Sequence, residues 1–233
     1  MGSMDETVAS SSASSSLLKA RLREIGIIPV VALERAEWAL PLADALLAGG
    51  LPVVEVTFRT AAAATILRTL RRERPQLLVG AGTVVTEANL HAALEAGAQF
   101  CVAPGFHRSI VEVCRQQGVP FVPGIATPSE IEAAFDCGVR LMKFFPAGAL
   151  GGTEMLQAIA APYAHLGIEF MPTGGVNPAN LASYLALKSV VAVGGTWLLK
   201  KEDADSGNWD AVRVRCLEAR AIAAAAGRKP TSL

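Results

Sequence analysis

The stretch Phe121-Val122-Pro123-Gly124-Ile125-Ala126-Thr127-Pro128-Ser129-Glu130 contains a complete transition from a strand to a helix. Its first six residues form a short apolar run of the kind found in buried strands. The last four form a capping box, with threonine at the N-cap, proline at the first helical position and glutamate at the third. The stretch therefore predicts one β–α unit.

The same order of a short apolar run, a break and an alanine- and leucine-rich segment recurs every 20 to 28 residues. Eight runs predict strands: Ile27–Leu33, Pro52–Phe58, Leu77–Thr83, Phe100–Pro104, Phe121–Ala126, Leu141–Pro146, Glu169–Thr173 and Val190–Gly194. Most are apolar throughout, which is typical of a parallel sheet covered by helices. Eight consecutive β–α units favour an α/β fold of the (β/α)8 TIM-barrel type. The alternative is an open doubly wound sheet, which would normally carry a GxGxxG turn after its first strand, and Val31–Arg35 has none.

The composition excludes several classes of protein. Hydrophobic residues make up 52% of the 233 residues and charged residues 18%, with no net charge, so the chain is not disordered. It has no basic excess to neutralise phosphates, which argues against nucleic acid as a partner. No apolar run of about 18 residues occurs, so we expect no membrane span.

Residues 1–16 are polar and serine-rich and begin with what resembles a cloning scar, so we expect a disordered tail before a single domain over residues 17–233. The four cysteines form no CxxC pair, which indicates buried free thiols in a reducing cytoplasm. The three histidines lie far apart and match no metal-binding pattern, which disfavours a histidine-based metal site.

Lys143 is the first candidate for chemistry, because it lies within the apolar run Leu141–Pro146. It is the only lysine between Lys19 and Lys188. Burial disfavours the charged form of an amine, and a neutral amine can attack a ketone to form a Schiff base. The alternative is a lysine that pairs with a carboxylate for structural reasons alone.

The second predicted strand supplies a complementary set. Alternation along Val53–Arg59 places Glu55 and Arg59 on one face, which in a barrel is the interior. A glutamate beside a lysine can shuttle protons, and an arginine at the rim can bind a carboxylate bidentately. The alternative is a buried ion pair without a reaction, which is costly to maintain.

Glycine-rich turns end the last two predicted strands, at Thr173-Gly174-Gly175 and at Gly194-Gly195-Thr196. Backbone N–H groups at these two turns form the usual phosphate site of such barrels. We therefore expect a side chain at Gly194 to obstruct a phosphate. The stretch Gly80–Thr83 either presents a hydroxyl to a substrate or forms a tight turn.

Together these motifs resemble the 2-dehydro-3-deoxy-6-phosphogluconate aldolases, the KDPG or KHG/KDPG aldolase family. The resemblance runs in collinear order from about Ile25 to Leu199. The stretches that carry it are Val54-Glu55-Val56-Thr57-Phe58-Arg59-Thr60, Val79-Gly80-Ala81-Gly82-Thr83-Val84, Ala103-Pro104-Gly105, Phe121-Val122-Pro123-Gly124-Ile125, Lys143-Phe144-Phe145-Pro146-Ala147, Pro172-Thr173-Gly174-Gly175-Val176 and Gly194-Gly195-Thr196-Trp197.

The resemblance implies a cytoplasmic class I aldolase, without metal or cofactor, that forms a homotrimer. Its substrate would be 2-dehydro-3-deoxy-6-phosphogluconate, cleaved to pyruvate and glyceraldehyde 3-phosphate. Lys143 would be the Schiff-base lysine and Glu55 the general acid and base. The residues that bind the pyruvyl part would be Arg59, Thr83, Pro104, Phe145 and Thr173. The residues that bind phosphate would be Gly174, Gly175, Gly194, Gly195 and Thr196.

The sequence leaves the substrate and the reaction partly open. Thr196 stands where several relatives have serine, and its extra methyl group could change which substrate fits. The galactonate epimer and 4-hydroxy-2-oxoglutarate are alternative substrates. A sugar-phosphate isomerase or epimerase would use Glu55 as a base and Lys143 only as a charge. A catalytically silent phosphate-binding protein is the third possibility, although binding alone does not require a buried amine.

Overall fold

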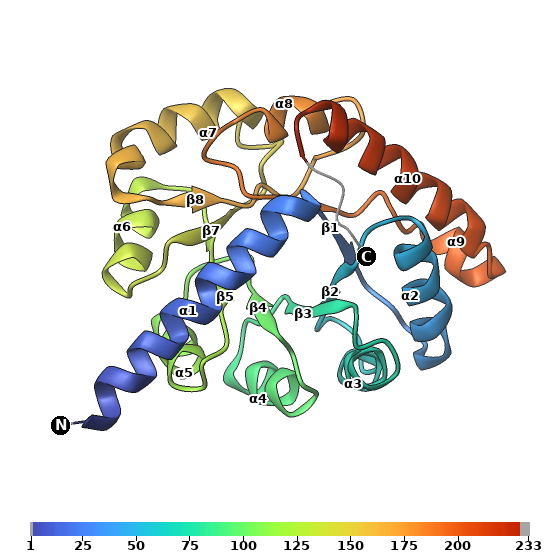
Figure 1. The fold of residues 1–233 in the computed structure, drawn as a ribbon, viewed down its shortest axis with the longest axis horizontal. Helices are drawn as coiled ribbons and strands as arrows, with labels where there is room; N and C mark the ends of the chain where they lie inside the picture. The colour runs from blue at the N-terminus through green and yellow to red at the C-terminus, as the bar shows by residue number, and fades with distance from the viewer. Residues whose placement is uncertain (1, 229–233) are drawn as a thin grey trace.

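The structure, a computed structural model, describes residues 2–228 and forms a ring of parallel strands surrounded by helices (Figure 1). Six strands form one sheet in the order β5-β4-β3-β2-β1-β9, and three form another in the order β6-β7-β8. The strands are β1 (Ile27–Val31), β2 (Val53–Thr57), β3 (Leu78–Gly82), β4 (Phe100–Val102), β5 (Phe121–Val122), β6 (Gly124–Ile125), β7 (Leu141–Phe144), β8 (Glu169–Phe170) and β9 (Val193–Gly195).

Backbone contacts close the two sheets into a barrel. β5 and β6 are one predicted strand, divided at Pro123, which has no N–H to donate. The Pro123 carbonyl still accepts from the Lys143 N–H at 2.8 Å, so the ring continues from β5 into β7. On the other side, the bridges Phe170↔Val190 and Thr173↔Gly194 join β8 to β9. The predicted TIM-barrel fold is confirmed, and each predicted strand overlaps at least one observed strand.

Helices follow the strands and cover the outside of the barrel (Figure 1). The capping box at Thr127 is formed, with both reciprocal bonds to Glu130. None of the helices among the described residues is long and apolar enough to span a membrane. After the N-terminal helix α1 (Gly2–Ile25), the helices are η1 (Ala36–Trp38), α2 (Ala39–Ala48), α3 (Ala63–Glu73), α4 (Glu87–Glu95), α5 (Arg108–Gln116), α6 (Pro128–Asp136), α7 (Gly152–Ala160), η2 (Ala161–Leu166), α8 (Leu181–Leu185), α9 (Lys201–Ser206) and α10 (Trp209–Ala225).

The N-terminal helix α1 (Gly2–Ile25) differs from the expectation of a disordered tail over residues 1–16. Neither glycine nor proline occurs between Ser3 and Ile25, and extending a helix that already exists costs little compared with starting one. The buried apolar side chains of its last part, Leu18, Leu22 and Ile25, belong to the core. A domain boundary near residue 17 stays a prediction.

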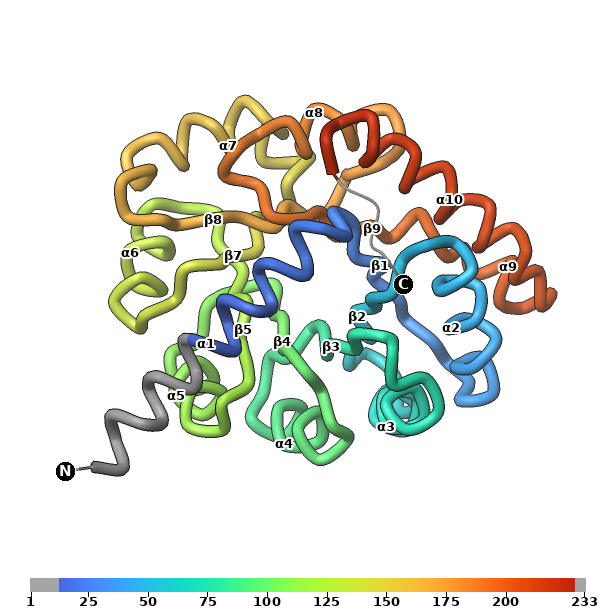
Figure 2. The backbone as a smooth tube through the Cα atoms, in the orientation of Figure 1, coloured from blue at the N-terminus to red at the C-terminus, as the bar shows by residue number. Residues whose placement is uncertain are grey.

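Polar contacts attach α1 to the end of the barrel at which the strands begin, and Figure 2 shows the helix crossing the ring from α5 toward β1. Lys19 Nζ lies 3.0 Å from Glu169 Oε2 at the start of β8, and Arg23 pairs with the same carboxylate. Arg220 of α10 donates to the Ile25 carbonyl at 2.6 Å, which satisfies a carbonyl at the helix end.

The four cysteines are free, as expected, and three of them are buried: Cys101, Cys114 and Cys216. Burial raises the pKa of the Cys216 thiol to about 12. Cys137 is half-buried.

Candidate active site

The centre of the candidate site is an ion pair across the inside of the barrel. β2 carries Glu55 and β7 carries Lys143, and the strand order places these two strands on opposite sides of the ring. Lys143 Nζ lies 3.3 Å from Glu55 Oε1, and the side chains are 7% and 0% exposed. The structure therefore brings together the two residues that the sequence selects as catalytic.

The two oxygens of the Glu55 carboxylate have different surroundings. Oε1 accepts from Lys143, whereas Oε2 is buried and has no hydrogen-bond partner among the described residues. An unsatisfied buried acceptor is costly, so this oxygen is available to a proton donor that enters the barrel. The Phe145 ring covers the same amine, with its centroid 5.5 Å from Lys143 Nζ.

Glycines in the strands provide the space that this pair requires. A Cβ atom at Gly82 would lie 2.2 Å from Glu55 Oε1, and one at Gly80 would lie 2.2 Å from the Phe100 ring. Only glycine is therefore compatible with the observed carboxylate position. Both glycines lie within β3, inside the predicted strand Leu77–Thr83, where a glycine often marks a close approach of another group.

Thr83 follows β3 directly and has a φ of 58°. A β-branched residue rarely adopts this left-handed conformation, which costs free energy and is found mostly at functional sites. Its side chain is half-buried at the end of the barrel where the strands finish. This strain supports the expectation that Thr83 faces a substrate.

Two further predicted substrate-binding residues lie against glycines. The carbonyl of Pro104 would lie 2.0 Å from a Cβ atom at Gly124, so Gly124 permits the approach of that carbonyl to β6. The Thr173 hydroxyl would lie 2.3 Å from a Cβ atom at Gly194. Gly82 and Gly124 are residues that sequence reasoning missed as parts of the site, and glycine inside an apolar strand was the available signal.

Arg59 lies beyond the end of β2 and is exposed. Its Nε donates to the Thr57 hydroxyl at 3.3 Å. It therefore lies at the rim, as the strand alternation predicts, while Glu55 lies inside.

The predicted phosphate-binding residues divide into two groups. Gly175 and Thr196 are exposed and Gly174 is half-buried, whereas Gly194 and Gly195 are buried. Gly174 and Gly175 have φ values of 88° and 83°, which only glycine adopts easily. A Cβ atom at Gly174 would contact the Phe145 ring at 3.2 Å, so this turn lies next to the residue that covers Lys143.

The structure corrects the expected effect of a side chain at Gly194. The Gly194 N–H already donates to the Pro172 carbonyl at 2.9 Å, and a side chain would first strike Thr173. A change at Gly194 would therefore disturb the predicted pyruvyl site as well as any phosphate. Thr196 and Gly175 are the better positions at which to examine phosphate binding.

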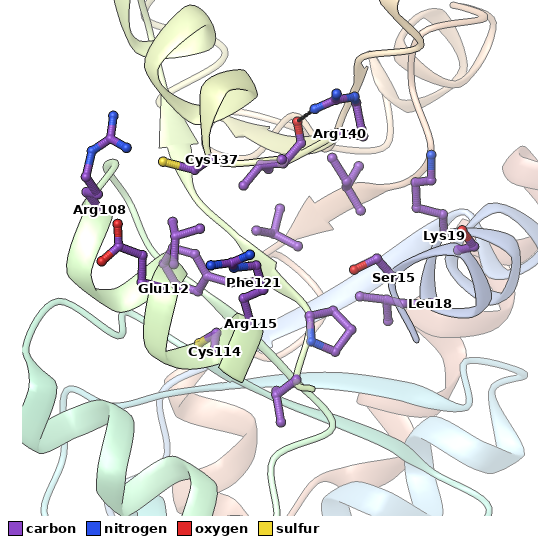
Figure 3. A pocket seen from close by; sticks show the side chains of 18 of the residues that line it. Ser15, Leu18, Lys19, Arg108, Glu112, Cys114, Arg115, Phe121, Cys137 and Arg140 are labelled. Carbon is purple, nitrogen blue, oxygen red and sulfur yellow. Dashed lines mark hydrogen bonds between the residues drawn. The ribbon is translucent and has the colours of Figure 1, made fainter. Parts of the chain in front are cut away.

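A separate hollow of about 540 Å³ lies between α1, α5, α6 and the beginnings of β5 and β7 (Figure 3). Figure 3 shows Arg108, Glu112 and Arg115 of α5 on one side of it and Lys19 of α1 on the other. Leu141, two residues before Lys143, marks the end of the barrel to which it belongs. The hollow differs from the barrel interior, where Lys143 and Glu55 are buried, because its charged residues on α5 are exposed: Arg108, Glu112 and Arg115. No group of three or more His, Cys, Asp or Glu side chains among the described residues could hold a metal ion.

Residues 18–215 match the family model described as KDPG and KHG aldolase. The chain belongs to this family. It is 46% identical to the 2-dehydro-3-deoxy-phosphogluconate aldolase of Haemophilus influenzae over 192 residues, 82% of this chain and 90% of the relative. It is 42% identical to the KHG/KDPG aldolase of Escherichia coli over 193 residues, 83% of this chain and 90% of the relative.

A solved structure from the KDPG and KHG aldolase family shows covalent chemistry. The KDPG aldolase of Legionella pneumophila contains pyruvate captured at low pH as a covalent carbinolamine intermediate. It is 39% identical to this chain, with a TM-score of 0.82, and the match covers 85% of this chain and 96% of the relative. A carbinolamine forms when an amine attacks a ketone, which is the reaction that a buried lysine such as Lys143 can perform.

Proposed function

We propose that this chain is a class I aldolase that cleaves 2-dehydro-3-deoxy-6-phosphogluconate to pyruvate and D-glyceraldehyde 3-phosphate. The observation that carries the proposal is the buried contact of 3.3 Å between Lys143 and Glu55 in a member of the KDPG and KHG aldolase family. The reaction needs no metal or cofactor, because the lysine imine itself accepts electrons from the bond that breaks.

The first step needs a neutral amine. Transfer of a proton from Lys143 to Glu55 along their contact converts a buried ion pair into two neutral groups, which reduces the cost of burial. Lys143 Nζ then attacks the C2 ketone to form a carbinolamine. The proton held by Glu55 passes to the carbinolamine hydroxyl, so that water leaves, a protonated imine forms and Glu55 is again a carboxylate. The C3–C4 bond breaks as its electrons move toward the imine.

Glu55 acts as the general base and then as the general acid in the second step. As a carboxylate it takes the proton of the C4 hydroxyl, and it later returns a proton to C3 of the enamine. The buried Oε2 supports this role, because it has no other partner among the described residues. Water then releases pyruvate from Lys143.

The remaining roles are those that the family resemblance implies. Arg59 would bind the substrate carboxylate, while Thr83, Thr173, the Pro104 carbonyl and the Phe145 ring would surround the pyruvyl part. The phosphate would lie at the turns that end the last strands, formed by Gly174, Gly175, Gly194, Gly195 and Thr196. The proposal includes a homotrimer that works in the cytoplasm.

A second activity, cleavage of 4-hydroxy-2-oxoglutarate to pyruvate and glyoxylate, is favoured by the 42% identity to a relative named KHG/KDPG aldolase. This substrate has no phosphate, so the two activities depend differently on the glycine-rich turns. Thr196 is the residue to vary, since it is exposed and lies outside the barrel interior.

Product analysis tests the proposal. The purified protein, given 2-dehydro-3-deoxy-6-phosphogluconate, should release equal amounts of pyruvate and glyceraldehyde 3-phosphate, and it should exchange the C3 protons of pyruvate with solvent. An isomerase or epimerase would instead convert the sugar phosphate without releasing pyruvate. A silent binding protein would leave both compounds unchanged. Sedimentation equilibrium tests the homotrimer.

A further inference from the structure

Arg59 has a long side chain beyond the end of a strand, so its position needs support. Two contacts join it to Thr57: the Arg59 backbone N–H donates to the Thr57 carbonyl at 2.9 Å, and Arg59 Nε donates to the Thr57 hydroxyl at 3.3 Å. An exposed arginine otherwise samples many rotamers, and ordering it on ligand binding costs free energy.

Thr57 is itself held in one orientation. Its side chain is only 3% exposed, and its hydroxyl donates to the Val31 carbonyl of β1 at 2.9 Å. A hydroxyl has a single proton to donate, so the oxygen of Thr57 can only accept from Arg59. The direction of both hydrogen bonds is therefore fixed by the end of β1.

A second threonine makes a similar anchor without touching Arg59. The Thr60 hydroxyl donates to the Leu33 carbonyl at 2.6 Å. Thr57 and Thr60 thus join the segment around Arg59 to the end of β1 at two points. Of these two threonines, only Thr57 contacts the Arg59 side chain.

We propose that Thr57 is a positioning residue for Arg59, orienting its guanidinium to bind the carboxylate of a 2-oxo acid. With Nε bound to Thr57, the two terminal nitrogens of the guanidinium remain for a bidentate contact with that carboxylate. The inference rests on the proposed function, in which Arg59 binds the substrate carboxylate. Thr57 acts before the substrate binds, because it restricts the rotamers of Arg59 and so reduces the conformational entropy that Arg59 loses on binding.

The experiment measures how borohydride trapping of pyruvate depends on pyruvate concentration, together with kcat and KM for cleavage. The Thr57→Val variant keeps the shape of the side chain and removes the hydroxyl, and Thr57→Ser keeps the hydroxyl. Loss of one hydrogen bond to a charged group should raise the half-saturating pyruvate concentration and KM about tenfold in Thr57→Val, with kcat nearly unchanged. The Thr57→Ser variant should stay within about twofold of the wild type, since its oxygen can make the same contacts.

Thr60→Val is the matched control, because it removes a hydroxyl that bonds to the Leu33 carbonyl just after β1 rather than to the Arg59 side chain. It should leave the pyruvate dependence unchanged. Combination with Arg59→Ala gives a second control: if Thr57 acts through Arg59, then Thr57→Val should add no further loss in that background.

Each outcome separates this inference from the proposed function. Failure of the wild type to trap pyruvate would reject the proposed function itself. Normal trapping by the wild type together with an unchanged pyruvate dependence in Thr57→Val would reject the role of Thr57. A full additional loss in the Arg59→Ala background, or an equal effect of Thr60→Val, would also reject it. If Thr57→Val does not fold, Thr57→Ala serves in the same comparisons.

Discussion

Two lysine–glutamate pairs, one inside the barrel and one at the end where the strands begin, differ in almost everything except distance. Lys143 and Glu55 lie 3.3 Å apart inside the barrel and are 7% and 0% exposed. Lys19 and Glu169 lie 3.0 Å apart where α1 crosses the other end, and they are 25% and 23% exposed. The shorter contact is thus the more exposed one.

Burial and hydrogen bonding, rather than distance, distinguish the two pairs. Glu169 receives two cations, Lys19 and Arg23, so its carboxylate is well satisfied. Glu55 has one cation and one oxygen without a partner among the described residues. Moving ions out of water is costly, so an incompletely satisfied buried pair points to a functional role rather than a structural one.

The largest expected difference concerns the two lysines. Lys143→Arg should abolish aldol cleavage, because a guanidinium stays protonated and cannot attack a ketone. Lys19→Arg should retain normal kcat, since the charge at the surface is preserved. Steady-state cleavage assays measure both, and substantial turnover by Lys143→Arg would contradict the comparison.

The two glutamates provide the next test. Glu55→Gln should lower kcat by about 10²–10⁴-fold, the usual contribution of a positioned general acid and base. Trapping of pyruvate should persist in this variant, though more slowly, because the amine is still present. A kcat within a few-fold of the wild type would show that another group transfers the proton.

Adding one methyl group at Gly82 tests whether the position of the Glu55 carboxylate is critical for catalysis. In Gly82→Ala the new Cβ atom would lie 2.2 Å from Glu55 Oε1, so the carboxylate must leave its observed position beside Lys143. A displacement of a catalytic group by about 1 Å can cost about 10²-fold in rate. The measurement is kcat alongside the melting temperature, and a folded variant with full kcat would show that the Glu55 position is not critical.

The surface pair should contribute only modestly to stability. Glu169→Gln weakens the contacts to Lys19 and Arg23 and should reduce the free energy of unfolding by about 1 kcal/mol or less, as measured for exposed ion pairs. Its kcat should equal that of the wild type. Urea denaturation and the cleavage assay together check both statements, and a loss of kcat would mean that the two ends of the barrel are coupled.

The smallest effect is expected at a third pair, between α2 and the end of α3. Hydrogen bonds from Arg74 at 2.6 and 2.9 Å lower the pKa of the Asp44 carboxyl. Because the folded pKa lies below the unfolded value of about 4, this stabilisation is present above that pH and is lost as the pH falls further. Wild type and Asp44→Asn should therefore differ in unfolding free energy at pH 6 and converge in acid, while a constant difference would contradict the pairing.

The sequence is sufficient to predict the strands and the central pair for clear physical reasons. The repeat of apolar runs and helical segments specifies a barrel, and a lysine or glutamate within an apolar strand is conspicuous because burying a charge is costly. Alternation along β2 then places Glu55 inside and Arg59 at the rim.

The roles of Gly82, Gly124 and Gly194 could not be predicted in the same way. What each glycine makes room for depends on which side chain of a neighbouring strand lies against it, and that depends on register between strands. Gly82 of β3 faces Glu55 of the adjacent β2, and Gly194 of β9 faces Thr173, in the register that the structure shows. The N-terminal helix was missed for a different reason, since a polar serine-rich segment carries no apolar periodicity.

The most direct test of the account is mass spectrometry of the protein after incubation with pyruvate and borohydride. Because reduction traps only an imine, the account predicts one adduct per chain, located on the peptide that contains Lys143. The Lys143→Arg variant should carry no adduct, while Lys19→Arg should be labelled as fully as the wild type. An adduct on a different lysine, or none in the wild type, would contradict the claim that the buried pair of Lys143 and Glu55 forms a Schiff base.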